Sequence, residues 1–243
     1  MQRPSCRPRP ARGFTLIELM VALSIMALLA LLSWRGLDAM VRAQQVTQER
    51  GERLTLLQTA LAQWRSDLDA MLPVSAQQTQ PVLAWNGRAL RVLRLAAVSD
   101  SLPANSETAL LLPAGTQVVA WSLRSACASL DAVPCWVRWQ SPVLRSVGEQ
   151  QQAWQQAARW AEGQGQLPGE QELVPASGWK LLHFRDANWR PASEQELPVA
   201  GEQALASMPD AIRLELQLPD TDSALQGTLT MDWMPATLTR RRS

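Results

Sequence analysis

The residues from Phe14 to Trp34 form an apolar run of 21 residues in which Glu18 is the only charged side chain. A helix over this run is roughly 30 Å long at about 1.5 Å per residue, which matches the hydrocarbon core of one bilayer. Residues 1–13 contain four arginines and no acid, and the positive-inside bias keeps such a segment in the cytoplasm. The run therefore predicts one transmembrane helix at residues 14–34, with the remainder of the chain on the outer side.

A cleaved secretory signal peptide is the alternative interpretation, because it also begins with basic residues. Such a peptide has a small-x-small cleavage site after its apolar run, and none follows Trp34. An acidic residue at the fifth position of the run is also atypical of a signal peptide. Both features favour a helix that stays in the membrane.

The segment Arg12-Gly13-Phe14-Thr15-Leu16-Ile17-Glu18, followed by uncharged residues up to Leu32, resembles the class III signal of type IV prepilins and type II secretion pseudopilins. In that family a prepilin peptidase cuts between the glycine and the phenylalanine on the cytoplasmic side and methylates the new amino terminus. The resemblance implies that residues 1–13 are a leader that is removed, with cleavage between Gly13 and Phe14 and methylation of Phe14. A glycine suits the cleavage position because a protease must approach the backbone closely.

Glu18 needs an explanation, because an acidic residue at the centre of a membrane helix costs about 2.5–3.5 kcal/mol on insertion scales. The family resemblance implies that Glu18 pairs with the amine of Phe14 in a neighbouring subunit during filament assembly. The alternative is that Glu18, one helical turn inside the run, reaches the lipid headgroups.

The helix is predicted to continue through residues 35–72 as a periplasmic extension, because the first proline beyond the run is Pro73. Between residues 54 and 71, apolar side chains recur at spacings of three and four: Leu54, Leu57, Leu61, Trp64, Leu68 and Met71. Polar residues fall between them: Arg53, Gln63, Arg65, Asp67 and Asp69. Such a stripe could form a coiled-coil seam, but it is shorter than three heptads, so packing on the protein's own sheet is favoured.

Residues 73–243 are predicted to form a β-rich periplasmic domain after a polar loop at 75–81. Asn86-Gly87 predicts a two-residue hairpin turn between strands at 82–85 and 88–95. Further elements are predicted at these positions: strands at 117–124, 135–144, 179–184, 212–218 and 225–233, and a helix at 150–162. The strand at 225–233 alternates as a half-exposed antiparallel strand does. The predicted fold class is α+β, a pilin-like long N-terminal helix packed on antiparallel β-sheet.

Cys127 and Cys135 remain once Cys6 is removed with the leader. Seven residues separate them, a spacing that fits neither a zinc knuckle nor a CxxC redox site. In an oxidising periplasm the pair is predicted to form a disulfide across the connection between strands 117–124 and 135–144. Two buried thiols are the alternative.

The sequence offers little for catalysis or cofactor binding. His183 is the only histidine and has no nucleophile or paired acid at motif spacing, which favours a structural role. Asp220, Asp222 and Asp232 lack the spacing of a calcium loop, so no metal is predicted. No glycine-rich loop opens a helix, which argues against a phosphate-binding cofactor. The basic tail at 240–242 is interpreted as a solvated end; a contact with acidic lipid or a partner is the alternative.

Three further stretches resemble the J-type minor pseudopilin of type II secretion: SWRGLDAMVRAQ, the leucine-rich helix after it, and the pattern HFRDANWRPAS…MPDAIRLELQL. The resemblance implies a subunit held in the inner membrane that joins I-type and K-type minor pseudopilins and the major pseudopilin. These would form the pseudopilus tip and initiate the filament that drives protein export.

Two other classes remain as alternatives. The first is a W-type minor pilin of a type IV pilus, whose soluble domain can resemble that of a J-type minor pseudopilin. The second is a membrane-anchored periplasmic enzyme, which would need an acid, base or nucleophile cluster that the sequence lacks.

Without residues 1–13 the chain has 19 basic and 22 acidic residues, so its net charge gives no reason to expect a nucleic-acid partner.

Overall fold

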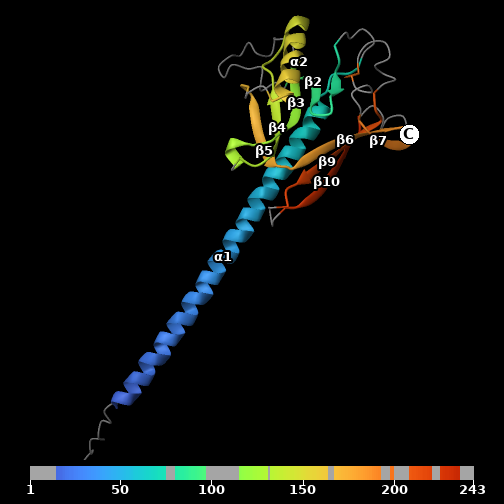
Figure 1. Cartoon of the computed structure of the whole chain (residues 1–243). Coiled ribbons are helices and arrows are strands. Elements are labelled where there is room, and N and C mark those ends of the chain that lie inside the picture. Colours follow the sequence, from blue (N-terminus) through green and yellow to red (C-terminus); the bar gives the residue numbers. More distant parts are fainter. Residues whose placement is uncertain are drawn as a thin grey trace, which may run out of the picture. The chain divides into compact units, whose positions relative to one another are not determined.

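Figure 1 shows a computed structural model of the chain. It describes residues 15–74, 80–96, 115–130, 132–163, 167–192, 198–199, 208–220 and 225–235. The chain divides into two compact units, one up to Gly51 and one from Glu52 onward. The predicted leader, the loop at 75–79 and the basic tail lie outside the described residues.

The long N-terminal helix is present as α1, Leu16–Asp69. In the first unit its large apolar side chains are exposed, as a lipid environment or neighbouring helices would require. Its most apolar 18-residue window has a mean hydropathy of 2.4, so α1 is long and apolar enough to cross a membrane.

The helix ends at Asp69, before the predicted boundary at residue 72, because the following residues pair with a strand. The backbone N–H of Leu72 donates to the carbonyl of Leu93 over 3.0 Å, and that of Leu95 donates to the carbonyl of Ala70 over 2.9 Å. Sheet pairing therefore ends the helix ahead of Pro73.

The described residues of the second unit form two antiparallel sheets, called sheet A and sheet B. Sheet A has the strand order β5-β4-β3-β2-β1-β8 and sheet B the order β10-β9-β6-β7. Sheet A comprises β1 Leu83–Trp85, β2 Leu90–Leu95, β3 Thr116–Arg124, β4 Cys135–Gln140, β5 Glu170–Pro175 and β8 Pro198–Val199. Sheet B comprises β6 Gly178–Arg185, β7 Asn188–Pro191, β9 Ala211–Leu218 and β10 Gly227–Trp233. Two further helical elements are η3 Ala128–Leu130 and α2 Val147–Ala161.

The predicted hairpin around Asn86 is present, but the prediction of a two-residue turn at Asn86-Gly87 is wrong. Trp85 pairs with Leu90, so residues 86–89 connect the strands. The Asn86 side-chain oxygen accepts hydrogen bonds from the backbone N–H groups of Arg88 and Ala89, at 3.1 and 2.7 Å. This side chain therefore closes a longer loop in place of the tight turn.

The other predicted elements are present with shifted ends, and β5, β7 and β8 were not predicted. The strand predicted at 135–144 ends at Gln140. The helix predicted at 150–162 begins at Val147, because Ser146 and Glu149 form a capping box. In it the Ser146 hydroxyl accepts from the Glu149 N–H over 3.2 Å, and the Glu149 carboxylate accepts from the Ser146 N–H over 3.0 Å.

Sheet A is buried on both faces, by α1 on one side and α2 on the other (Figure 1). Alternate residues of β3 belong to different cores: Val119 and Trp121 pack with α1, whereas Val118 and Ala120 pack with α2. This separation follows from the two-residue period of a strand. Sheet A therefore forms the central layer of the unit.

The predicted apolar stripe of α1 packs on the protein's own sheets, as expected. Leu57, Trp64 and Leu68 are buried in one core with residues of both sheets, although Leu54 is exposed. In sheet B, the predicted half-exposed strand is confirmed, because Trp233 is buried and Thr230 is exposed. One α1 residue assigned to the polar positions is misplaced by the prediction: Asp67 is fully buried.

Candidate assembly site and charged core

The predicted cleavage and methylation positions, Gly13 and Phe14, lie outside the described residues. Glu18 is described and lies exposed in the first turn of α1. Its Oε2 lies 3.4 Å from both the backbone nitrogen and the hydroxyl oxygen of Thr15, two donors to the carboxylate. Only the glutamate half of a capping box is present, because the Glu18 N–H donates to the Thr15 carbonyl over 3.1 Å and not to the Thr15 hydroxyl. A carboxylate here also interacts favourably with the helix dipole.

The predicted disulfide between Cys127 and Cys135 is present. The two Cα atoms are 6.0 Å apart, and both cysteines are fully buried on the α2 side of sheet A. Cys127 follows β3 and Cys135 begins β4, so the bond closes the connection between these strands, as predicted.

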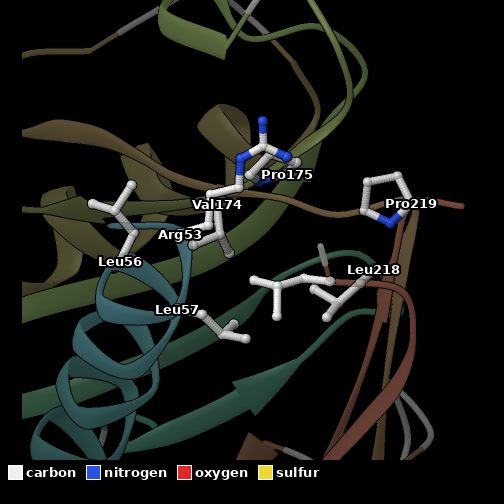
Figure 2. Close-up of a pocket in the computed structure, with 8 residues that line it drawn as sticks. Arg53, Leu56, Leu57, Val174, Pro175, Leu218 and Pro219 are labelled. Carbon is white, nitrogen blue, oxygen red and sulfur yellow. The ribbon is translucent and has the colours of Figure 1, made fainter. Parts of the chain in front are cut away.

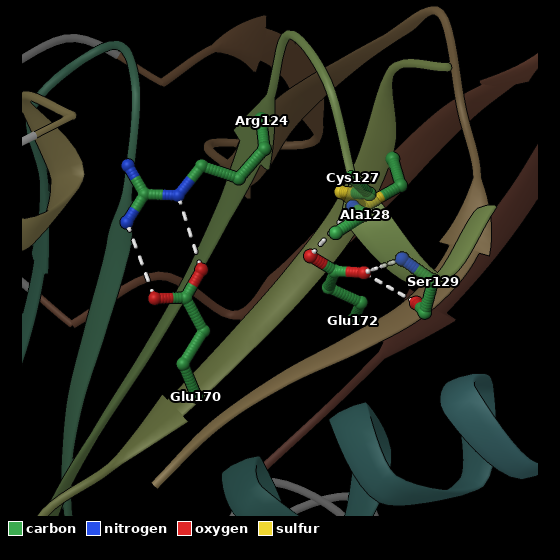
Figure 3. The surroundings of a disulfide bond; sticks show 7 residues. Arg124, Cys127, Ala128, Ser129, Glu170 and Glu172 are labelled. Carbon is green, nitrogen blue, oxygen red and sulfur yellow. Dashed lines mark hydrogen bonds and ion pairs between the residues drawn. A yellow bond between two sulfur atoms is a disulfide. The ribbon is translucent and has the colours of Figure 1, made fainter. Parts of the chain in front are cut away.

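Glu172 of β5 stabilises the loop that the disulfide closes (Figure 3). Its carboxylate accepts hydrogen bonds from the N–H groups of Ala128 and Ser129, at 3.1 and 2.8 Å, and from the Ser129 hydroxyl. The Ser129 hydroxyl first, and then the Ser129 N–H, lower the pKa of Glu172, because these bonds favour its charged form. The disulfide therefore joins the loop to the start of β4, and the Glu172 carboxylate joins it to β5.

Glu170, two residues earlier in β5, is also bonded to neighbouring elements. It accepts from Nε of Arg124 on β3 over 3.2 Å (Figure 3). It also accepts from the Trp160 indole of α2 over 2.8 Å. The Arg124 guanidinium stacks over the Trp160 ring, 4.8 Å from its centroid. The two glutamates fix β5 at its place in sheet A.

Among the residues considered for catalysis or metal binding, those that the structure describes form no common site. His183 is buried in β6, in agreement with a structural role. Asp232 pairs with Arg213 over 2.6 and 2.8 Å, Asp220 follows β9, and Asp222 lies outside the described residues. Within the described part of the chain, no group of three or more His, Cys, Asp or Glu side chains could hold a metal ion.

A small apolar pocket of about 30 Å³ lies among α1, the end of β5 and the segment between β9 and β10 (Figure 2). Its lining residues are Arg53, Leu56, Leu57, Val174, Pro175, Leu218, Pro219 and Leu225. This volume has room for only a few water molecules and is far below the roughly 300–1,000 Å³ of typical ligand pockets.

Asp67 lies where α1 meets sheet A and receives donors from several elements. Arg138 of β4 donates through Nε to Oδ2 at 2.7 Å and through Nη2 to Oδ1 at 2.9 Å. Arg94 Nη1 lies 3.2 Å from Oδ1, and the Trp121 indole donates to Oδ2 over 2.9 Å. Gln63, one helical turn away, donates to Oδ1 over 3.1 Å. All of the carboxylate's acceptor capacity is used.

Sequence reasoning missed this charged core, although one signal was present. Arg138 lies two residues from Trp136 and therefore shares its strand face, and a face with a tryptophan is often buried. Asp67 lies next to Leu68 on the helix, which also places it beside the apolar stripe.

Removing one partner of a buried ion pair such as Asp67–Arg138 typically costs about 3–5 kcal/mol of stability, because it leaves an uncompensated charge.

A family model, the prokaryotic N-terminal methylation motif, matches residues 8–34. This span includes the predicted cleavage position and the predicted membrane helix.

Two curated proteins, both named type II secretion system protein J, are similar to the chain. The protein of Escherichia coli is 25% identical over 221 residues, which is 82% of this chain and 91% of the relative. The protein of Klebsiella pneumoniae is 32% identical over 65 residues, or 27% of this chain and 33% of the relative. These similarities and the motif agree with the resemblance found in the sequence.

Proposed function

We propose that the chain is a J-type minor pseudopilin of the type II secretion system, anchored in the inner membrane by α1. The observation that carries the proposal is the methylation motif at residues 8–34, on a chain similar over 82% of its length to a J protein. The fold supports the same function, because one long N-terminal helix with antiparallel sheets is the pilin-like arrangement that the resemblance implies. The subunit then acts by assembly.

In this proposal, residues 1–13 form the leader, residues 14–34 span the membrane, and residues 35–72 continue the helix on the periplasmic side. The domain of residues 73–243 is periplasmic, where Cys127 and Cys135 can be oxidised. A prepilin peptidase cuts between Gly13 and Phe14 and methylates Phe14.

Glu18 then drives recruitment. An acidic residue inside the bilayer is costly, so its pairing with the amine of Phe14 in an adjacent subunit favours the assembled state. I-type and K-type minor pseudopilins and the major pseudopilin are the partners. Together they form the tip that initiates the filament.

Deletion of the gene in its native host tests the proposal. We expect secretion of exoproteins to be lost while type IV pili remain, and the intact gene supplied in trans to restore secretion. Intact secretion with lost pili would instead indicate a W-type minor pilin.

A further inference from the structure

We propose that Asp67, Arg94 and Arg138 form a register lock, which fixes the rotation and axial position of α1 on sheet A. The proposal deepens the proposed function and rests on it, because α1 is the element that an assembling subunit presents to its neighbours. These three residues are then positioning residues for assembly.

The geometry of the register lock favours one placement of the helix. Asp67 is fully buried, and Arg94 and Arg138 are 6% and 2% exposed. The planar fork of Arg138 meets both carboxylate oxygens, which fixes the direction of approach. Arg94 joins Asp67 to β2 and, through Gln117 at 3.0 Å, to β3. The lock therefore connects α1 to three strands.

Beside the backbone pairing of residues 70–72 with β2, part of the apolar stripe of α1 discriminates less well between registers than the charged residues do. The stripe repeats Leu57 with Leu61 and Trp64 with Leu68, each four residues apart. A slide of one turn, roughly 5.4 Å, brings Leu61 to the place of Leu57 and Leu68 to that of Trp64. At the buried Ala60, the same slide would require the larger Trp64 side chain. The same slide replaces Asp67 by an uncharged residue, Gln63 or Met71, and takes the carboxylate away from the guanidinium groups of Arg94 and Arg138.

Stability alone does not account for the register lock. Buried ion pairs replaced by apolar residues of similar volume often leave a protein equally stable or more stable, because the desolvation of the charges no longer opposes folding. The best-attested role of buried polar groups is to specify a register.

Spin-label distances test the register in the full-length protein in detergent micelles. One nitroxide is placed on α1 by Gln58→Cys and one on β5 by Gln171→Cys, since both positions are exposed. The background is Cys6→Ser, and Cys127 and Cys135 are protected by their disulfide. We expect one narrow distance in this labelled protein.

The test variant is Asp67→Leu/Arg94→Met/Arg138→Met, which keeps apolar volume and removes all three charges. We expect it to fold with a thermal midpoint close to the parent and to show a second distance, displaced by about 5 Å for a one-turn slide. The matched control removes the bidentate pair of sheet B by Arg213→Met/Asp232→Leu. This control should keep the single distance.

A single, unshifted distance in the triple variant would overturn the register lock. A triple variant that does not fold would overturn it as well, because the cluster would then serve stability.

Arg138→Lys gives a second test, since it keeps the charge and loses the planar fork. A broadened distribution of spin-label distances supports the proposal, and an unchanged distribution opposes it. These distances do not depend on secretion, so failure of the proposed function would appear separately, as unchanged export after gene deletion.

Discussion

At the scale of single residues, Glu18 has a local and an intermolecular role that a substitution can separate. Within the chain its carboxylate lies at the start of α1, close to donors of Thr15. Glutamine retains an acceptor for Thr15 but removes the charge needed to pair with an amine. The local role therefore survives in Glu18→Gln, and the proposed intermolecular role does not.

We expect Glu18→Gln to be inserted in the membrane at the parent level and to reduce secretion by roughly tenfold or more. A lost ion pair of only about 1.4 kcal/mol already changes an equilibrium tenfold. Secreted enzyme activity and membrane immunoblots measure the two effects. Glu49→Gln, an exposed position on the same helix, should leave both unchanged. Parent-level secretion by Glu18→Gln would contradict the assembly role.

Glu172 gives a prediction for pH. Its pKa is lowered in the folded state, so its hydrogen bonds stabilise the fold fully above the ordinary pKa of about 4.3 and progressively less as the pH falls through the lowered value. Glu172→Gln should therefore melt at a lower temperature than the parent at pH 7, with the difference shrinking below about pH 4. Melting curves from pH 3 to 8 measure this.

The matched control is Asp210→Asn, at an exposed carboxylate on the chain before β9. Its melting temperature should follow the parent across the whole pH range. A difference between parent and Glu172→Gln that did not change with pH would contradict the assigned role of the carboxylate.

At the scale of elements, the connection between β3 and β4 depends on its disulfide. The double variant Cys127→Ala/Cys135→Ala should lose about 2–3 kcal/mol in free energy of unfolding, the value expected for so short a closed loop. Urea unfolding of the purified chain measures the loss, and Cys6→Ala is the control. Reduced and non-reduced masses of the parent should differ by about 2 Da. Equal unfolding midpoints in the parent and the double variant would contradict this stabilising role.

The sequence predicted elements where a local pattern coincided with burial. The α1 stripe, the β9 strand and the alternating β10 strand each place apolar residues on one face, so periodicity was sufficient. β5 was missed because Glu170 and Glu172 interrupt its apolar pattern, and their partners come from other elements. Asp67 was misassigned for a similar reason: Arg138 lies 71 residues away, and no local pattern encodes such a contact.

At the scale of the whole molecule, the C-terminal part of α1 is a component of the domain's core. Trp64 and Leu68 pack with residues from both sheets, and Asp69 of the same helix accepts a hydrogen bond from the Trp233 indole of β10 over 2.7 Å. That bond joins positions 164 residues apart. The core of the domain is therefore complete only when the C-terminal part of α1 and the strand β10 are both present.

We therefore expect a fragment of residues 52–243 to fold and a fragment of residues 70–243 to remain unfolded. The shorter fragment lacks Leu57, Trp64 and Leu68, and truncating even one buried tryptophan costs about 3–5 kcal/mol against a total stability of about 5–15 kcal/mol. Tryptophan fluorescence during urea unfolding should give a cooperative transition only for the longer fragment. Within it, Trp64→Ala should lower the midpoint strongly, whereas Leu54→Ala, at an exposed position, should change it little. A cooperative transition in residues 70–243 would mean that the sheets form a core without α1.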